Sequence, residues 1–274
     1  PKPMPGGRPS QDVRYRLSPM RRHRGGTLAT LIALALICVL PATALAVSVT
    51  YRLEVVNTWS TTTHPGAFPQ DPHFSWLGGG THSDRVSFWS VGELASSGME
   101  QMAETGVTTM LLGEVQTAVG AGDAFAPVEW RQWFCPSEVT HLSCGSLVVE
   151  FEVDENFPLV TLVSMLGPTP DWFVGTDALN LRPGGSWVPS LETTLFPYDG
   201  GTISTNAFEL GGDPSLEPIT LITDDTGQLI GGQSLGAFRF TLVPEPGTAL
   251  LTAFGVAVLA LRRRSRGWRR FKNV

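Results

Sequence analysis

Apolar and polar residues alternate at the start of the chain's central part. Apolar side chains at positions 49, 51, 53 and 55 alternate with polar ones at 50, 52 and 54. A period of two predicts a half-buried strand over 47–56. Similar patterns predict strands at 147–153, 159–166, 178–181, 193–196, 219–223 and 238–242. The polar residues 154–156 form a turn-like link between the second and third of these strands.

Helical spacing is weaker and confined to one region. Leu94, Met99 and Met102 predict a helix over 93–104 with Gly106 as its C-terminal cap, and a second helix is expected over 110–118. Segments 62–83 and 119–146 are predicted as loops, the first because it is rich in Gly, Pro and His. Many short strands separated by Gly and Pro favour an all-β fold, an antiparallel β-sandwich with one or two short helices in connecting segments.

The N-terminal region has the composition of a secretion signal. Residues 20–24 are mostly basic, residues 28–40 are apolar, and Ala44-Leu45-Ala46 fits a signal-peptidase site. The apolar run of about 13 residues is short for a membrane span, which takes roughly 20. We therefore expect residues 1–46 to be an N-terminal extension and signal peptide, with Met20 as the better initiator.

The C-terminal region contains a second targeting pattern. Val243, Pro244, Glu245 and Pro246 precede an apolar stretch at 248–261 and an arginine cluster at 262–266. The prolines block a helix before Gly247, the apolar stretch forms one, and the arginines stop transfer. An ordinary membrane anchor is the simple interpretation.

The order of these parts resembles the PEP-CTERM sorting signal. That resemblance implies a Gram-negative bacterium, export across the inner membrane to the cell surface or matrix, processing by an exosortase, and transient membrane insertion of the C-terminal helix. Residues 243–274 are then a sorting tail, and 47–242 form one domain.

Removing both ends changes the charge of the chain. Fourteen of the 19 basic residues and only two of the 25 acidic residues lie outside 47–243, which leaves that segment a formal charge of −18 and no lysine. Such a field repels nucleic acid and attracts cations. We expect no nucleic-acid partner.

Two of the three cysteines remain after the apolar run that contains Cys38 is set aside. Cys135 and Cys144 form an even pair, which predicts a disulfide in an oxidising compartment, with two free thiols as the alternative.

Two aspartates follow strand-like segments and prolines. Asp171 comes after Pro168 and Pro170 and before an aromatic pair, and Asp199 follows Pro197 and enters a glycine-rich turn. Carboxylates on rigid loops at strand ends supply the oxygen ligands that Ca²⁺ takes. Turn capping by the same side chains is the alternative.

Several motifs across residues 50–240 resemble the spondin N-terminal domain: Asn57-Thr58-Trp59-Ser60, His64-Pro65, Phe74-Ser75, the segment from Gly92 to Gly98, Ala103-Glu104-Thr105-Gly106, and above all Pro168-Thr169-Pro170-Asp171-Trp172-Phe173-Val174-Gly175. The resemblance implies an antiparallel β-sandwich related to C2 domains, with one bound Ca²⁺. It places the metal carboxylates at Glu152, Asp171 and Asp199. Glu150 and Asp154 remain alternatives to Glu152.

The chain also departs from that family. After Asp199 it has Gly200-Gly201-Thr202-Ile203, where the family has a second aspartate, and Arg182 stands where the family has a cysteine. The family's disulfide framework therefore does not transfer to Cys135 and Cys144.

The resemblance implies binding, not turnover. Family members act in cell attachment and matrix association, so the expected partner is a matrix or exopolysaccharide component or a surface protein, and we predict no enzyme. The chain has no GxSxG, P-loop or HExxH motif. A hydrolase that uses Asp171 and Asp199 as acid and base, and an exopolysaccharide-binding module, remain alternatives.

Tryptophan and histidine side chains are further candidate site residues. Five tryptophans could form a glycan platform, but we expect core or loop anchors: Trp59, Trp76, Trp89, Trp172 and Trp187. For His64, His73 and His82 we expect structural hydrogen bonding.

Overall fold

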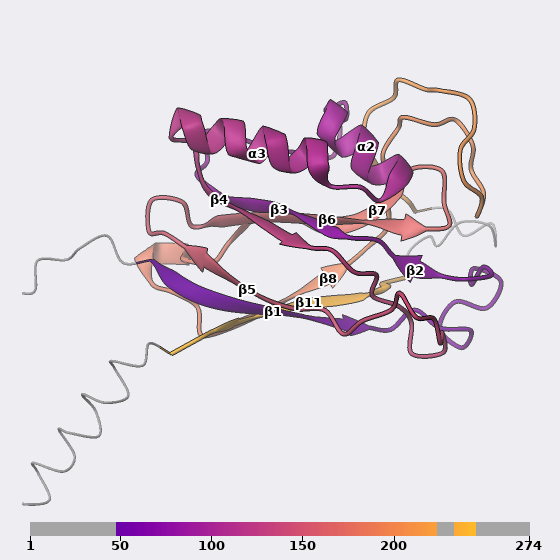
Figure 1. The fold of residues 1–274 in the computed structure, drawn as a ribbon, viewed down its shortest axis with the longest axis horizontal. Coiled ribbons are helices and arrows are strands. Elements are labelled where there is room, and N and C mark those ends of the chain that lie inside the picture. Colours follow the sequence, from indigo (N-terminus) through magenta and orange to yellow (C-terminus); the bar gives the residue numbers. More distant parts are fainter. Residues whose placement is uncertain (1–47, 224–232, 245–274) are drawn as a thin grey trace, which may run out of the picture. The chain divides into compact units, whose positions relative to one another are not determined.

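Two antiparallel sheets lie face to face, and two helices cover the outer face of one of them (Figure 1). This computed structural model describes residues 48–223 and 233–244. It confirms the predicted all-β sandwich with short helices. Within the described residues no helix has the length and apolarity that a membrane crossing requires. The predicted leader, Glu245, Pro246 and the C-terminal apolar stretch lie outside the described residues.

The four-stranded sheet has the order β5-β1-β11-β8. Its strands are β1 (Val49–Asn57), β5 (Val148–Val153), β8 (Ser190–Leu195) and β11 (Gly236–Leu242). Alternation was a sound predictor here because only one face is covered: Tyr51 and Leu53 are fully buried, whereas Arg52 is exposed and pairs with Glu150 across the strands.

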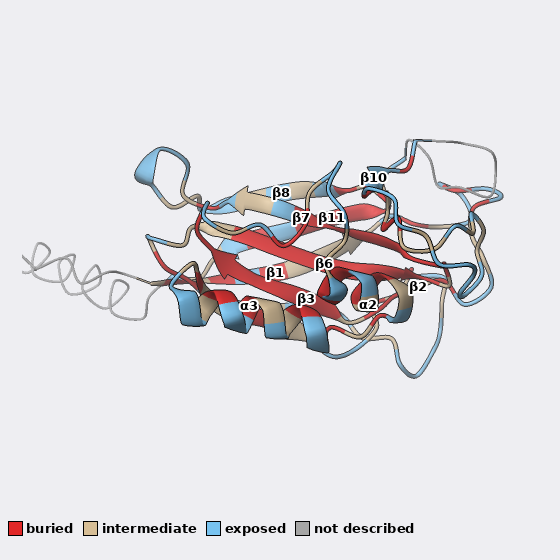
Figure 2. Ribbon diagram, turned by 90° about the horizontal axis from the view of Figure 1, so that it is seen from above, coloured by how far each residue is buried: buried red, intermediate tan, exposed pale blue. Residues whose placement is uncertain are grey.

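The second sheet has the order β10-β9-β7-β6-β3-β4, and β2 pairs with β6 at its end. The strands are β2 (His73–Phe74), β3 (Leu77–His82), β4 (Ala124–Trp130), β6 (Leu159–Gly167), β7 (Trp172–Asn180), β9 (Tyr198–Asp199) and β10 (Thr220–Leu221). Both faces of β6 are covered, so its sequence is mostly apolar, and its two polar residues, Thr161 and Ser164, are buried as well. Val160 and Leu162 pack between the sheets, whereas Val163 and Met165 pack under the helices. Figure 2 shows β6 buried along most of its length.

The helices are α2 (Ser97–Thr105) and α3 (Thr109–Ala121). The first begins later than predicted because Ser96 is its N-cap: the Ser96 Oγ accepts a hydrogen bond from the Met99 N–H at 3.2 Å. As predicted, Gly106 ends it, in the left-handed conformation with φ of 71°. Met99, Met102, Leu111 and Val115 turn inward onto the sheet.

Strand β3 was predicted as loop because its sequence, LGGGTH, has almost no side chains to show a period. The glycines are needed for packing. A Cβ on Gly79, whose φ is 151°, would overlap the carbonyl oxygen of Thr161 on β6. A Cβ on Gly78 or Gly80 would meet the side chains of Thr108 or Val115 at 2.6 Å. Helix α3 can therefore lie directly on this strand.

A disulfide joins Cys135 and Cys144, whose Cα atoms are 5.6 Å apart. It closes the connection that follows β4. Residues 124–130 form a strand, so the predicted loop over 119–146 is corrected in its first part.

The sandwich has two distinct ends. At one, which we call the terminal end, β1 starts and β11 stops: Tyr51 pairs with Leu242, and the Val243 N–H donates to the Thr50 carbonyl at 2.8 Å. At the other, the loop end, β6 stops at Gly167 and β7 begins at Trp172. Figure 1 shows β2 and the β6–β7 connection at the end opposite to the start of β1.

Candidate functional site

Asp171 lies at the loop end, in the connection between two central strands. Thr169 closes this connection, since its Oγ1 accepts a hydrogen bond from the Trp172 N–H at 3.1 Å. The flanking Trp172 is fully buried between the sheets. The Asp171 side chain is itself completely buried, at 0% exposure, which is rare for a carboxylate.

One oxygen of Asp171 has three donors and the other has none. Oδ2 accepts from the Thr202 N–H at 2.7 Å, the Ile203 N–H at 3.0 Å and the Thr202 hydroxyl at 3.2 Å. Oδ1 is buried without a protein partner. A buried carboxylate oxygen without a partner is costly, so the site calls for a proton or a cation there.

Asp199 is the neighbouring carboxylate. It pairs with Trp172 across β7 and β9, and the Gly200 N–H donates to the Asp171 carbonyl at 3.1 Å. Its Oδ1 accepts from the Gly201 N–H at 2.8 Å. The structure thus brings these two predicted ligands together on adjoining strands.

Burial and charge both disfavour ionisation at this pair. Burial, reinforced by the negative charge of Asp199, raises the pKa of Asp171 to about 6, although the donors from Thr202 and Ile203 oppose the shift. Burial also raises the pKa of Asp199; the Gly201 N–H opposes this, and the nearby Glu217 carboxylate adds to it.

A glycine turn holds Glu217 beside the pair. Gly201 has φ of 71°, and a Cβ there would overlap the Glu217 carbonyl. The Glu217 N–H donates to the Gly201 carbonyl at 2.9 Å. The donors of Thr202 and Ile203 and the place of Glu217 beside the pair were not predicted from the sequence. The departure from the family at 200–203 was the available signal, since glycines allow the backbone N–H groups to turn toward Asp171.

Glu152 does not join this site, and the expected convergence of three carboxylates is corrected here. Glu152 lies on β5 in the other sheet, where its carbonyl accepts from the Thr81 hydroxyl at 3.3 Å. Thr81 pairs with Val160 on β6, whereas Asp171 lies beyond Met165, which pairs with Phe173. The five steps along β6 from Val160 to Met165 span about 17 Å at roughly 3.3 Å per residue.

The alternative Glu150 lies on β5 and pairs with Arg52 of β1, and the alternative Asp154 directly follows Val153, the last residue of β5. Neither of them lies at the loop end. Among residues 48–223 and 233–244, no group of three or more His, Cys, Asp or Glu side chains is arranged to hold a metal.

The charge balance of the domain nevertheless favours cations. Its five basic side chains each lie within 4 Å of a carboxylate, in the pairs Arg52–Glu150, Arg85–Asp123, Arg131–Glu129, Arg182–Glu155 and Arg239–Glu192. No arginine pairs with Asp171 or Asp199 in the described part of the chain. Among these residues, no basic side chain neutralises the Asp171–Asp199 pair.

The remaining candidates are placed in the interior or at its margin. Trp59, Trp89 and Trp172 are buried, and Trp76 and Trp187 are half-buried. His82 donates from Nδ1 to the Ser83 carbonyl at 2.8 Å, and its Nε2 lies 2.8 Å from the Thr161 hydroxyl. His64 lies 2.8 Å from the Thr63 hydroxyl.

Taken together, the two sheets and the buried loop-end carboxylates define an antiparallel β-sandwich module. The spondin N-terminal family (Spondin_N) matches residues 49–227, and the chain belongs to this family. It is 33% identical over 170 residues to Spondin-1 of Homo sapiens, covering 61% of this chain and 20% of that protein. It is 33% identical over 161 residues to Spondin-2 of Homo sapiens, covering 58% of this chain and 47% of that protein. The chain thus spans between about a fifth and half of the length of these relatives.

Proposed function

We propose that this protein is a secreted binding module that attaches to extracellular matrix or exopolysaccharide, and that Ca²⁺ at its loop end holds the β6–β7 and β9–β10 connections together. The unpartnered, buried Oδ1 of Asp171 beside Asp199 supports this proposal more than any other observation. Asp171 and Asp199 would hold the cation through their carboxylates. A bound Ca²⁺ would supply the positive charge that relieves their repulsion.

A binding role fits the site better than hydrolysis. A general acid or base must come within hydrogen-bond reach of its substrate. Asp171 is fully buried, and its hydrogen-bond donors are the N–H groups of Thr202 and Ile203 and the Thr202 hydroxyl. A substrate therefore has no direct access to this carboxylate. A cation that only orders the loop end does not have to contact the ligand that the protein binds.

Removal of Ca²⁺ tests the metal proposal. If Ca²⁺ is present at about 100 times its Kd, it stabilises the folded protein by about 2.7 kcal/mol. We expect EDTA to lower the melting temperature of the purified protein and excess Ca²⁺ to restore it, with Mg²⁺ less effective. An unchanged melting temperature in EDTA refutes the metal site and leaves the family assignment intact.

Export and sorting are a separate part of the proposal. The patterns at 20–46 and 243–266 support secretion, exosortase processing and delivery to the surface of a Gram-negative cell. Fractionation of cells that express the full chain, compared with a chain ending at Leu242, tests this. Equal surface delivery of both would contradict a sorting role for the tail.

A further inference from the structure

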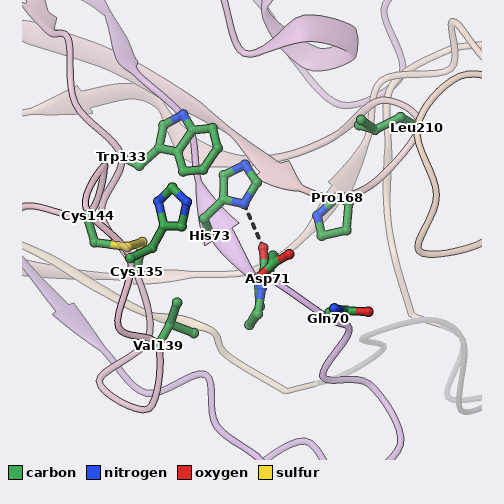
Figure 3. Close-up of a pocket in the computed structure, with 11 residues that line it drawn as sticks. Gln70, Asp71, His73, Trp133, Cys135, Val139, Cys144, Pro168 and Leu210 are labelled. Carbon is green, nitrogen blue, oxygen red and sulfur yellow. Dashed lines mark hydrogen bonds between the residues drawn. A yellow bond between two sulfur atoms is a disulfide. The ribbon is translucent and has the colours of Figure 1, made fainter.

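A second site lies beside the loop end, in a pocket of about 290 Å³. One wall comes from residues 70–73, another from the disulfide-closed segment, and a third from Pro168 and Leu210 (Figure 3). Pro168 belongs to the β6–β7 connection that ends in Asp171, but the carboxylate pair does not line the pocket.

Three stacked rings build the aromatic side of this pocket. Trp133 stacks on His73 with ring centroids 3.8 Å apart and an angle of 13° between the planes. His141 stacks on Trp133 at 5.5 Å and 25°. Because the rings cover one another where they stack, their remaining surfaces, with Val139, Pro168 and Leu210, form the apolar part of the lining.

The disulfide fixes the rings in place. The backbones of Trp133 and Cys144 form an isolated parallel β-bridge, and the Gly145 N–H donates to the Trp133 carbonyl at 2.7 Å. The Cys135–Cys144 bond closes the segment that carries His141. His73 is fixed from the other side, because it pairs with Gly167 on β6. The stack is therefore preorganised and loses little conformational freedom when a ligand binds.

Hydrogen-bonding groups of both kinds line the pocket. The His73 Nδ1 lies 2.7 Å from the Asp71 carbonyl, which can only accept, so Nδ1 carries the proton, and Nε2 lies against Gly167 of β6. The His141 Nδ1 accepts from the Ser143 N–H at 3.1 Å, so a neutral ring carries its proton on Nε2. The Gln70 amide adds a donor and an acceptor, and the exposed Asp71 carboxylate adds acceptors.

We infer that this pocket binds one neutral pyranose ring of a polysaccharide. The C–H faces of a sugar ring pack against aromatic planes, and its hydroxyls match a lining that both donates and accepts. The volume is near the lower limit of ligand pockets, roughly 300 Å³, which suits a single ring.

The charges of the domain select among sugars. An acidic sugar meets Asp71 and a domain with a formal charge of −18, so it is disfavoured. The charges do not exclude a cationic amino sugar, because its ammonium group can pair with the Asp71 carboxylate, so glucosamine serves only as a comparison. The inference deepens the proposed role in extracellular binding and rests on it.

Saturation-transfer NMR on the purified full-length protein tests the pocket. The probes are the methyl glycosides of glucose, galactose and mannose, with galacturonic acid and glucosamine as charged comparisons. We expect transfer to at least one neutral glycoside. His141→Ala should weaken its binding about tenfold, equivalent to about 1.4 kcal/mol. Trp133→Ala should weaken it at least as much.

Leu142→Ala is the matched control, because Leu142 is the adjacent residue, is fully exposed and does not line the pocket. His141 is also exposed, so its replacement should leave the fold intact, which circular dichroism checks. The inference is overturned if no neutral glycoside receives transfer, if galacturonic acid binds better than the neutral glycosides, or if His141→Ala binds like the control.

The same titrations in excess Ca²⁺ and in EDTA separate the two proposals. Sugar binding without a Ca²⁺ effect on stability removes only the metal site. A Ca²⁺ effect without sugar binding removes only the pocket assignment.

Discussion

Replacing Asp171 by Asn should have opposite effects with and without a divalent cation. The amide keeps an oxygen to accept from the Thr202 and Ile203 N–H groups, but it carries no charge. It removes the electrostatic cost of the buried carboxylate and also removes a ligand for the cation.

The magnitude follows from the pKa. An aspartate carboxyl has an ordinary pKa of 3.8, and burial beside Asp199 raises the pKa of Asp171 to about 6. The folded state therefore holds the proton more tightly than the unfolded chain. Its contribution to stability is complete below about pH 3.8 and is lost as the pH rises through about 6. At 1.36 kcal/mol per unit, the loss at pH 7 is about 3 kcal/mol.

In EDTA at pH 7, Asp171→Asn should recover up to about 3 kcal/mol of unfolding free energy, which corresponds to roughly 6–12 °C for a domain of this size. The difference from the unsubstituted protein should shrink toward pH 4. In excess Ca²⁺ the unsubstituted protein should gain stability and the variant should not.

Urea denaturation from pH 4 to pH 8, in EDTA and in Ca²⁺, measures all of these quantities. Asp84→Asn is the control, because Asp84 is exposed, and its effect should stay within about 0.5 kcal/mol. A variant that is less stable than the unsubstituted protein in EDTA at pH 7 would refute the electrostatic reasoning. A variant that responds to Ca²⁺ as strongly as the unsubstituted protein would refute the assignment of Asp171 as a ligand.

Three further changes test the scaffold. Replacing both Cys135 and Cys144 by Ser should lower the unfolding free energy by about 2–3 kcal/mol, because the disulfide closes a loop of about ten residues. In denaturation curves, a reductant should destabilise the unsubstituted protein by the same amount and leave the double variant unchanged. Trp59→Ala should cost about 3–5 kcal/mol, because Trp59 is 1% exposed and its Nε1–H donates to the Ala67 carbonyl at 2.9 Å; a calorimetric loss below about 1 kcal/mol would contradict its place in the core. Gly79→Ala should prevent stable pairing of β3 with β6, whereas Gly113→Ala, in open space on α3, should be neutral or stabilising; comparable melting temperatures for the two variants would disprove the packing argument.

The strands that sequence alone could predict are those with side chains on one covered face. β1, β5 and β11 show the alternation that a half-covered sheet imposes, and β6 shows the mostly apolar sequence of a strand between two cores. β3 could not be predicted this way, because its three glycines carry no pattern. Its place follows from backbone space that only the folded neighbours Thr161 and Val115 define.

The candidate site was predictable in part for a similar reason. Prolines and glycines around Asp171 and Asp199 identified two loop-end carboxylates, and the fold brings them together. Glu152 was placed by matching along the chain, which does not tell which sheet a strand joins. The stacked rings of His73, Trp133 and His141 come from segments about 60 residues apart, and no spacing along the chain indicates such a contact.

The pairing of the first and last strands has a consequence for how the domain is displayed. Because Thr50 and Val243 are hydrogen-bonded neighbours, chain segments on either side of the domain leave it from the same pole. A tether on either flank, whether to a membrane, a partner domain or a cell wall, would hold the molecule by its base. Asp171, Asp199 and the ring-lined pocket would then project outward, toward whatever the cell meets.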